Sequence, residues 1–131
     1  MVCLDTSVLV PLLRKDGRAL SHLSRAVTEG SKISTTVVSL CELYAGAYGS
    51  ANTTKELQKI ERLTSTLEIF ALSEEASRRY GELLNSKPIK AQPVGDFDLI
   101  IAAIVLTNSE ALATRNPEHF GRIPGLSLEA W

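Results

Sequence analysis

Apolar residues along the chain follow two periods, and each period predicts a different kind of element. Five short apolar runs predict β-strands at 2–5 (VCLD), 32–36 (KISTT), 67–72 (LEIFAL), 111–114 (ALAT) and 126–130 (LSLEA). Between them, apolar residues recur every three or four positions, which predicts helices at 6–13, 17–29, 37–48, 54–66, 73–86 and 96–108. Thr6 or Ser7 and Ser73 are suited to begin helices, and Gly30 is suited to end one.

The order of these elements predicts the fold class. Strands that alternate with helices are typical of an α/β protein with a parallel sheet. We therefore expect a three-layer sandwich, in which helices flank a mainly parallel central sheet of four to five strands, as a single domain over residues 1–131. In such sheets, binding sites form beyond the carboxyl ends of the strands. Asp5 ends the first predicted strand, so it is the first candidate for a site residue.

The composition is that of an ordinary globular protein. Apolar residues make up 44% of the 131 residues and charged residues 22%, and no apolar run approaches the roughly 20 residues of a transmembrane helix. The first residues lack the features of a secretory signal, because no basic residue precedes the apolar part and Asp5 interrupts it. Cys3 and Cys41 both lie in apolar surroundings, which predicts buried free thiols and a cytoplasmic protein.

The net charge of −1 limits how the chain could bind nucleic acid. A protein that holds long nucleic acid by electrostatics alone is normally strongly basic. Any contact with nucleic acid is therefore expected to be local, or to use positive charge from a metal ion or a partner. Two groups of basic residues are available for such contacts: Arg14, Lys15 and Arg18, and the pair Lys87 and Lys90 in the loop before the last long helix.

Acidic residues are the only charged side chains in three apolar stretches. Asp5 is alone in residues 1–13, Glu42 is alone in residues 33–54, and Asp96 and Asp98 are alone in residues 91–109. A buried carboxylate needs a raised pKa, a cationic partner or a metal ion. If these acids converge, mutual repulsion raises their pKa values, and oxygen ligands of this kind select Mg²⁺ or Mn²⁺. Such an ion activates water for phosphodiester hydrolysis.

Each acid also has a purely structural interpretation. Asp5 and Asp96 are suited to cap helices, and acids in the first turn of a helix are stabilised by the helix dipole by about 0.3 to 1 kcal/mol. Glu42 could face solvent on a narrow polar strip with Ser39. A cap needs only one carboxylate, however, so Asp98 is left to point elsewhere.

The residues resemble the successive motifs of one family. The segments LDTSVLV (4–10), ISTTVVSLCELYAG (33–46), VGDFDLIIAA (94–103) and LATRNPEHFGRIPGL (112–126) are similar, in this order, to motifs of PIN-domain ribonucleases. Within these, the chain resembles the VapC-like toxins of bacterial and archaeal toxin-antitoxin pairs. The resemblance covers nearly the whole chain.

The resemblance implies roles for particular residues. The metal-binding and catalytic acids of the family fall on Asp5, Glu42 and Asp98, and the cofactor implied is Mg²⁺ or Mn²⁺. Thr6 matches a hydroxyl position that orients the first acid or its water. The family's fourth acidic position falls on Asn116, a poorer metal ligand than a carboxylate. Asp96 is ranked as a helix cap first and a secondary ligand second.

Two residues near Asn116 are further candidates. Arg115 and His119 could contact phosphate, and His119 is read first as a packed or partly exposed histidine and second as a catalytic base. The resemblance implies products with 5′-phosphate and 3′-hydroxyl ends, formed by a metal-activated water without a histidine base.

The resemblance also implies partners. These are an RNA substrate such as tRNA or another structured RNA, a VapB-like antitoxin whose tail enters the active-site groove, and a second copy of the chain in a homodimer. Apolar residues of helices 6–13 and 17–29 could serve these surfaces or the core.

Two rival functions remain open. One is a PIN-like domain that binds RNA or a partner with little or no cleavage, which Asn116 makes conceivable. The other is a receiver-type phosphoryl-transfer domain that uses Asp5 as acceptor. It is disfavoured because the strand at 111–114 offers no lysine near the acids.

Overall fold

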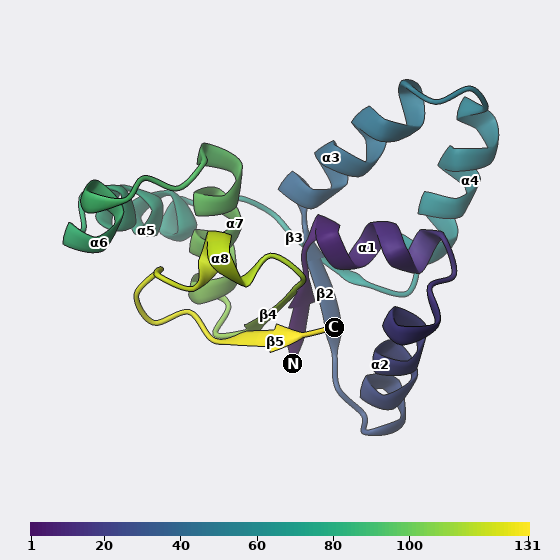
Figure 1. Cartoon of the computed structure of the whole chain (residues 1–131), viewed down its shortest axis with the longest axis horizontal. Helices are drawn as coiled ribbons and strands as arrows, with labels where there is room; N and C mark the ends of the chain where they lie inside the picture. The colour runs from purple at the N-terminus through teal and green to yellow at the C-terminus, as the bar shows by residue number, and fades with distance from the viewer.

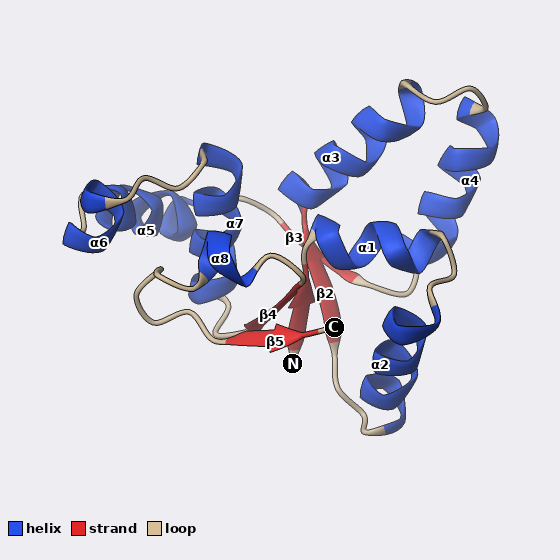
Figure 2. Cartoon of the chain, in the orientation of Figure 1, coloured by secondary structure: helices blue, strands red, loops and turns tan.

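The computed structural model describes every residue from 1 to 131 and contains a five-stranded sheet with helices on both sides (Figure 1). The strands are β1 Val2–Leu4, β2 Ile33–Thr36, β3 Glu68–Phe70, β4 Ala111–Thr114 and β5 Leu128–Ala130. The helices are α1 Thr6–Leu13, α2 Gly17–Thr28, α3 Val37–Tyr48, α4 Thr53–Thr64, α5 Glu74–Leu84, α6 Lys87–Ala91, α7 Asp96–Thr107 and α8 Pro117–Phe120 (Figure 2). All neighbouring strands pair in parallel, so the predicted fold class is confirmed.

The sheet divides the core into two parts, and β1 shows how. Val2 and Leu4 lie in one apolar cluster with buried residues of α1, α2, α3 and α4. Cys3, between them, lies in a second cluster with buried residues of α5, α6, α7 and α8. This alternation follows from the two-residue period of a strand, which sends successive side chains to opposite faces. Figure 1 shows the first four helices on one side of the sheet and the last four on the other.

Helix α7 is the most deeply buried helix and anchors the acidic segment at its start. Its buried residues are Leu99, Ile101, Ala102, Ala103, Ile104 and Val105. A helix that is apolar on all sides is stable only inside the protein, and α7 packs against α3, α5, α8 and β4. The first turn of α7, which carries Asp96 and Asp98, is therefore held at a fixed place beside the sheet.

The strand order β3-β2-β1-β4-β5 fixes where a site can form. The chain builds the sheet outward from β1 through β2 to β3, and then returns to the other side of β1 with β4 and β5. The carboxyl ends of β1 and β4 therefore lie at the point where the order reverses, which is where parallel α/β sheets bind ligands. Asp5 directly follows β1, and Thr114 is the last residue of β4.

Most predicted elements are confirmed within two or three residues, including the helix start at Ser73, whose side chain accepts from the Ala76 N–H. Four details were wrong, and one of them is the start of α1, whose N-cap is Asp5 and not Thr6 or Ser7. Lys87 and Lys90, expected in a loop, lie in the short helix α6, and residues 117–120, for which no helix was predicted, form the short helix α8. Cys41, expected to be buried, is exposed on α3, whereas Cys3 is buried. None of the helices combines the length and the apolar character that crossing a membrane requires.

Candidate functional site

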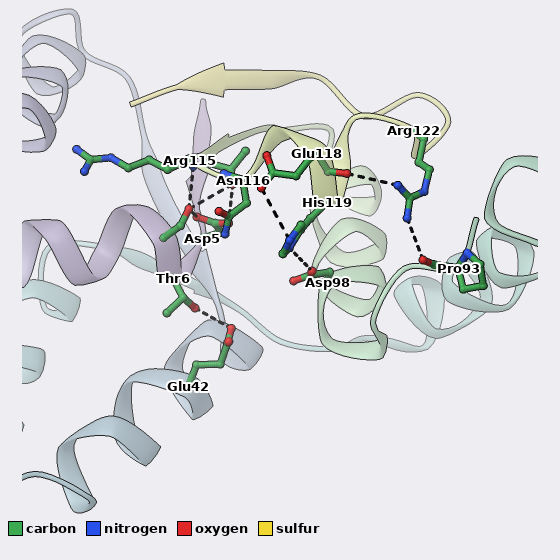
Figure 3. Close-up of polar contacts among 12 residues, drawn as sticks. Asp5, Thr6, Glu42, Pro93, Asp98, Arg115, Asn116, Glu118, His119 and Arg122 are labelled. Carbon is green, nitrogen blue, oxygen red and sulfur yellow. Dashed lines mark hydrogen bonds and ion pairs between the residues drawn. The ribbon is translucent and has the colours of Figure 1, made fainter. Parts of the chain in front are cut away.

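Asp5 is the buried centre of a hydrogen-bond network at the carboxyl ends of β1 and β4 (Figure 3). The Ser7 hydroxyl donates to Oδ1 of Asp5 at 2.6 Å, and the Thr114 hydroxyl donates to Oδ2 at 2.7 Å. The two hydroxyls accept in turn from the backbone N–H groups of Arg115, at 2.8 Å, and Asn116, at 2.9 Å. Asp5 occupies the N-cap position of α1, but its carboxylate makes no capping hydrogen bond. The backbone N–H groups of Ser7 and Val8 nevertheless offset part of the rise that burial causes in the pKa of this carboxyl, so capping contributes at Asp5 but does not account for its two hydrogen-bonded hydroxyls.

The environment of Asp5 alters its acidity. Burial raises the pKa of this carboxyl above its ordinary value, and the hydrogen bonds from Ser7 and Thr114 offset only part of the rise. The direction agrees with the prediction from clustered acids, but the cause is desolvation rather than repulsion between carboxylates. A buried carboxylate with only neutral donors favours any nearby positive charge, including a metal ion.

Glu42 is held from the neighbouring helix α1. The Thr6 hydroxyl donates to Oε1 of Glu42 at 2.7 Å. The resemblance had implied that Thr6 orients Asp5, but in the structure it orients Glu42. Ser39, expected to share a solvent-facing strip with Glu42, is completely buried and hydrogen-bonds with Thr36. Glu42 itself is only partly exposed. The structural interpretation, in which Glu42 shares a solvent-facing polar strip with Ser39, is therefore wrong.

Asp98 and Asp96 have different surroundings at the start of α7. Oδ2 of Asp98 lies 3.1 Å from Nδ1 of His119, and the Asp98 side chain is 30% exposed. The N-cap of α7 is Gly95, so the prediction that Asp96 caps the helix was wrong by one residue. Asp96 is exposed and accepts a long hydrogen bond, 3.4 Å, from the hydroxyl of Tyr80 on α5.

The other candidate residues are placed as follows. Asn116 is the N-cap residue of α8, and its only hydrogen bond to Thr114 is through the backbone. Arg115 pairs with Asp16 at 2.7 Å and donates from Nε to the carbonyl of Trp131 at 2.9 Å, so its guanidinium is engaged within the protein. Arg14 and Lys15 are exposed at the end of α1. These two, together with Arg18, Lys87 and Lys90, which are also exposed, remain the basic candidates for contact with phosphate.

The three principal acids come from elements that pack on one another. Asp5 begins α1, Glu42 lies in α3 and Asp98 in α7, and α3 contacts both α1 and α7. Carboxylate oxygens are suited to a hard divalent cation. However, no group of three His, Cys, Asp or Glu side chains lies close enough together to hold a metal ion. The donor set nevertheless fits such an ion in its chemistry, because Mg²⁺ keeps several waters and is commonly bound through only one or two carboxylates.

Sequence reasoning missed three functional candidates, namely Ser7, Thr114 and the pairing of His119 with Asp98. Ser7 was considered only as a cap, and Thr114 was read as one residue of a strand. The available signal was topological: Thr114 ends the strand beside β1 in a parallel sheet, and the side chain that ends a strand faces the same edge as Asp5.

Comparisons with known proteins show the family to which the chain belongs. A model of the PIN domain family matches residues 2–126. Ribonuclease VapC2 of Rickettsia felis is 30% identical over 128 residues, which cover 98% of this chain and 96% of that protein. The tRNA(fMet)-specific endonuclease VapC of Salmonella typhimurium is 30% identical over 101 residues, which cover 77% of this chain and 76% of that protein.

A solved structure extends the likeness to three dimensions. The crystal structure of VapBC2 from Rickettsia felis bound to a DNA fragment from their promoter has a TM-score of 0.92 at 28% identity. The superposition covers 100% of this chain and 99% of that chain.

Proposed function

The chain belongs to the PIN-domain family, and on that premise we propose that it is a VapC-type endoribonuclease, the toxin of a toxin-antitoxin pair, which hydrolyses RNA with a divalent cation. One observation carries the proposal. Asp5 is buried at the reversal point of the sheet and held by two hydroxyls, beside helices that carry Glu42 and Asp98. Burying a carboxylate is unfavourable unless a positive charge compensates it, and a cation bound at this edge would do so.

The three acids of the site are held by different hydrogen-bond donors, but we propose that they bind the same divalent cation. Asp5, Glu42 and Asp98 would hold Mg²⁺ or Mn²⁺ through carboxylate oxygens. The bound ion supplies Lewis acidity and lowers the pKa of a water molecule, which is the chemistry that phosphodiester hydrolysis needs. The protein's own hydroxyls fix the orientation of Asp5 and Glu42 before any ion binds. The expected products carry 5′-phosphate and 3′-hydroxyl ends, and Asp96 and Asn116 rank behind the three acids.

The substrate that we propose is RNA, and tRNA is the first candidate because a relative is a tRNA(fMet)-specific endonuclease. The chain has 14 basic and 15 acidic residues, so RNA binding would depend on local charge and not on net charge. Arg14 and Lys15 supply such charge at the end of α1.

The partner that we propose is a VapB-like antitoxin, because the solved relative is a VapBC complex. A groove of about 370 Å³ supports this. Its walls come from α1, α3 and α4, with an apolar part formed by Val10, Leu13, Leu43, Ala47 and Ile60, and Arg14 and Glu42 at its polar part. A peptide segment with an apolar face and a polar end fits this lining. We further propose a cytoplasmic homodimer, in which Leu20 and Val27, both exposed on α2, are candidate contacts.

The nuclease proposal is tested with purified protein and tRNA in the presence of Mg²⁺ or Mn²⁺, with a matched sample in EDTA. Asp5→Asn, Glu42→Gln and Asp98→Asn should each abolish cleavage. Glu82→Gln, at an exposed carboxylate on α5, is the matched control and should cleave normally. Asp96→Asn should mainly change the melting temperature, and equal loss of cleavage at Asp96 and Asp98 would show that the two acids are ranked wrongly. Cleavage that persists in EDTA or in all three site variants refutes the mechanism.

One observation favours a second candidate function. Because no three donors are assembled for a metal ion, the chain could instead be a PIN-like module that binds RNA or a partner with weak or no cleavage. This alternative predicts that tRNA binds equally well in Mg²⁺ and in EDTA and stays intact in both. Cleavage that requires the metal excludes it.

A further inference from the structure

His119 and Asp98 form a contact between two helices that are distant in sequence, α8 and α7. Nδ1 of His119 lies 3.1 Å from Oδ2 of Asp98. An ionised carboxylate can only accept a hydrogen bond, so Nδ1 must carry the proton in this pair. Oδ1 of Asp98 has no hydrogen-bond donor within the protein and stays available. The imidazole thus holds one oxygen of Asp98 and leaves the other free.

The position of His119 is fixed by its neighbours on both sides. Phe120, the next residue, is buried in the core beneath α7. Arg122 donates from Nε to the carbonyl of Gln92 and from Nη2 to that of Pro93, both at 2.9 Å. These contacts, of which Figure 3 shows the one with Pro93, tie the segment after α8 to the loop before α7. Although the His119 side chain is 51% exposed, its backbone is anchored, which lowers the entropic cost of keeping the imidazole against Asp98.

We propose that His119 is a positioning residue for Asp98: its Nδ1–H fixes the Asp98 carboxylate so that the free oxygen can serve a divalent cation. Carboxylates that ligate metals are themselves commonly held by hydrogen bonds, and removal of such a partner typically costs about 10- to 100-fold in metal affinity. Each of the three acids then has its own side-chain holder: Ser7 and Thr114 for Asp5, Thr6 for Glu42, and His119 for Asp98. This inference rests on the proposed function.

The test uses two substitutions, His119→Asn and His119→Gln, which distinguish the contribution of Nδ1 from that of Nε2. The amide nitrogen of asparagine is as many bonds from the backbone as Nδ1, and that of glutamine reaches as far as Nε2. Mn²⁺ binding, followed by the electron paramagnetic resonance signal of the free ion, should be near wild type in His119→Asn. It should weaken by about 10- to 100-fold in His119→Ala and His119→Gln. Excess Mn²⁺ should restore tRNA cleavage by His119→Ala but not by Asp98→Asn.

A second readout needs neither metal nor RNA. Nitrogen NMR of the metal-free protein at about pH 9, well above the ordinary pKa of histidine, should show His119 with its proton on Nδ1. The Asp98→Ala variant should lose this preference. His22, the only other histidine, stacks on Trp131 at 5.5 Å between ring centroids and provides the internal control.

Two results overturn the inference. One is Mn²⁺ affinity that is unchanged in His119→Ala, and the other is equal behaviour of His119→Asn and His119→Gln. If the wild-type protein itself neither binds Mn²⁺ nor cleaves tRNA, the inference fails together with the proposed function. That case is recognised before any His119 variant is compared.

Discussion

Replacement of Thr114 by valine removes one hydroxyl from the network around Asp5 and keeps the side-chain shape. Thr114 is 3% exposed, and its hydroxyl both donates to Asp5 and accepts from the Asn116 N–H. Hydrogen bonds to charged groups contribute about 1.5 to 3 kcal/mol, and the Asn116 N–H left without a partner adds about 1 kcal/mol. Valine is similar in volume and equally suited to a strand, so no cavity opens. We expect Thr114→Val to lower the free energy of unfolding by about 2 to 4 kcal/mol.

Urea unfolding and thermal melting of the metal-free protein measure this loss. For a chain of this length, 1 kcal/mol corresponds to roughly 3 to 5 °C in the melting temperature. The loss should depend on the charge of Asp5, so Thr114→Val should cost less in an Asp5→Asn background, with a coupling of about 1 to 2 kcal/mol. Thr114→Ser, which keeps the hydroxyl, is the matched control. An equal cost of Thr114→Val in both backgrounds, or a gain in stability, would refute the reasoning.

Three further predictions concern other polar groups of the fold. Burial raises the pKa of Asp5, so the folded state loses stability as the pH rises from the ordinary pKa of an aspartate through that raised pKa. In urea titrations, the gain in the free energy of unfolding from Asp5→Asn should therefore grow over this pH range. A difference between the two proteins that does not depend on pH would contradict this. Glu110 is 6% exposed, one of its carboxylate oxygens has no hydrogen-bond partner, and burial raises its pKa. Because a buried charge without a partner is unfavourable, Glu110→Gln should melt at a higher temperature than the wild type at pH 7 and should cleave tRNA equally well. Thr6→Val frees the partly exposed Glu42, so tRNA cleavage should fall severalfold while the free energy of unfolding changes by less than about 1.5 kcal/mol; unchanged cleavage would show that Thr6 does not orient Glu42.

The sequence predicted the sheet and most helices because local signals and the fold agree along this chain. The apolar runs at β1 and β4 are short and bounded, and each helix start has a polar capping residue or a glycine. The two elements that were missed, α6 and α8, are only five and four residues long, too short for a helical period to show.

The candidate site was predictable in its acids but not in the groups that hold them. Asp5, Glu42 and Asp98 stand out because each carboxylate interrupts an apolar stretch. Their partners depend on which helices and strands lie together, as when Thr114, 109 positions away in sequence, reaches Asp5. The burial of Cys41 and the solvent-facing strip of Glu42 with Ser39 were misjudged for the same reason, because the exposed face of α3 is set by its contacts with α1 and α4. Whether the three acids share one metal ion stays a prediction.

The central claim is that these acids form a metal-dependent nuclease site, and analysis of the ends of the RNA products tests it most directly. tRNA is incubated briefly with the wild-type protein in Mn²⁺ or in EDTA, and the ends of the fragments are identified. The account predicts fragments with 5′-phosphate and 3′-hydroxyl ends in Mn²⁺ and intact tRNA in EDTA. Fragments with 2′,3′-cyclic phosphate ends that also form in EDTA would contradict it.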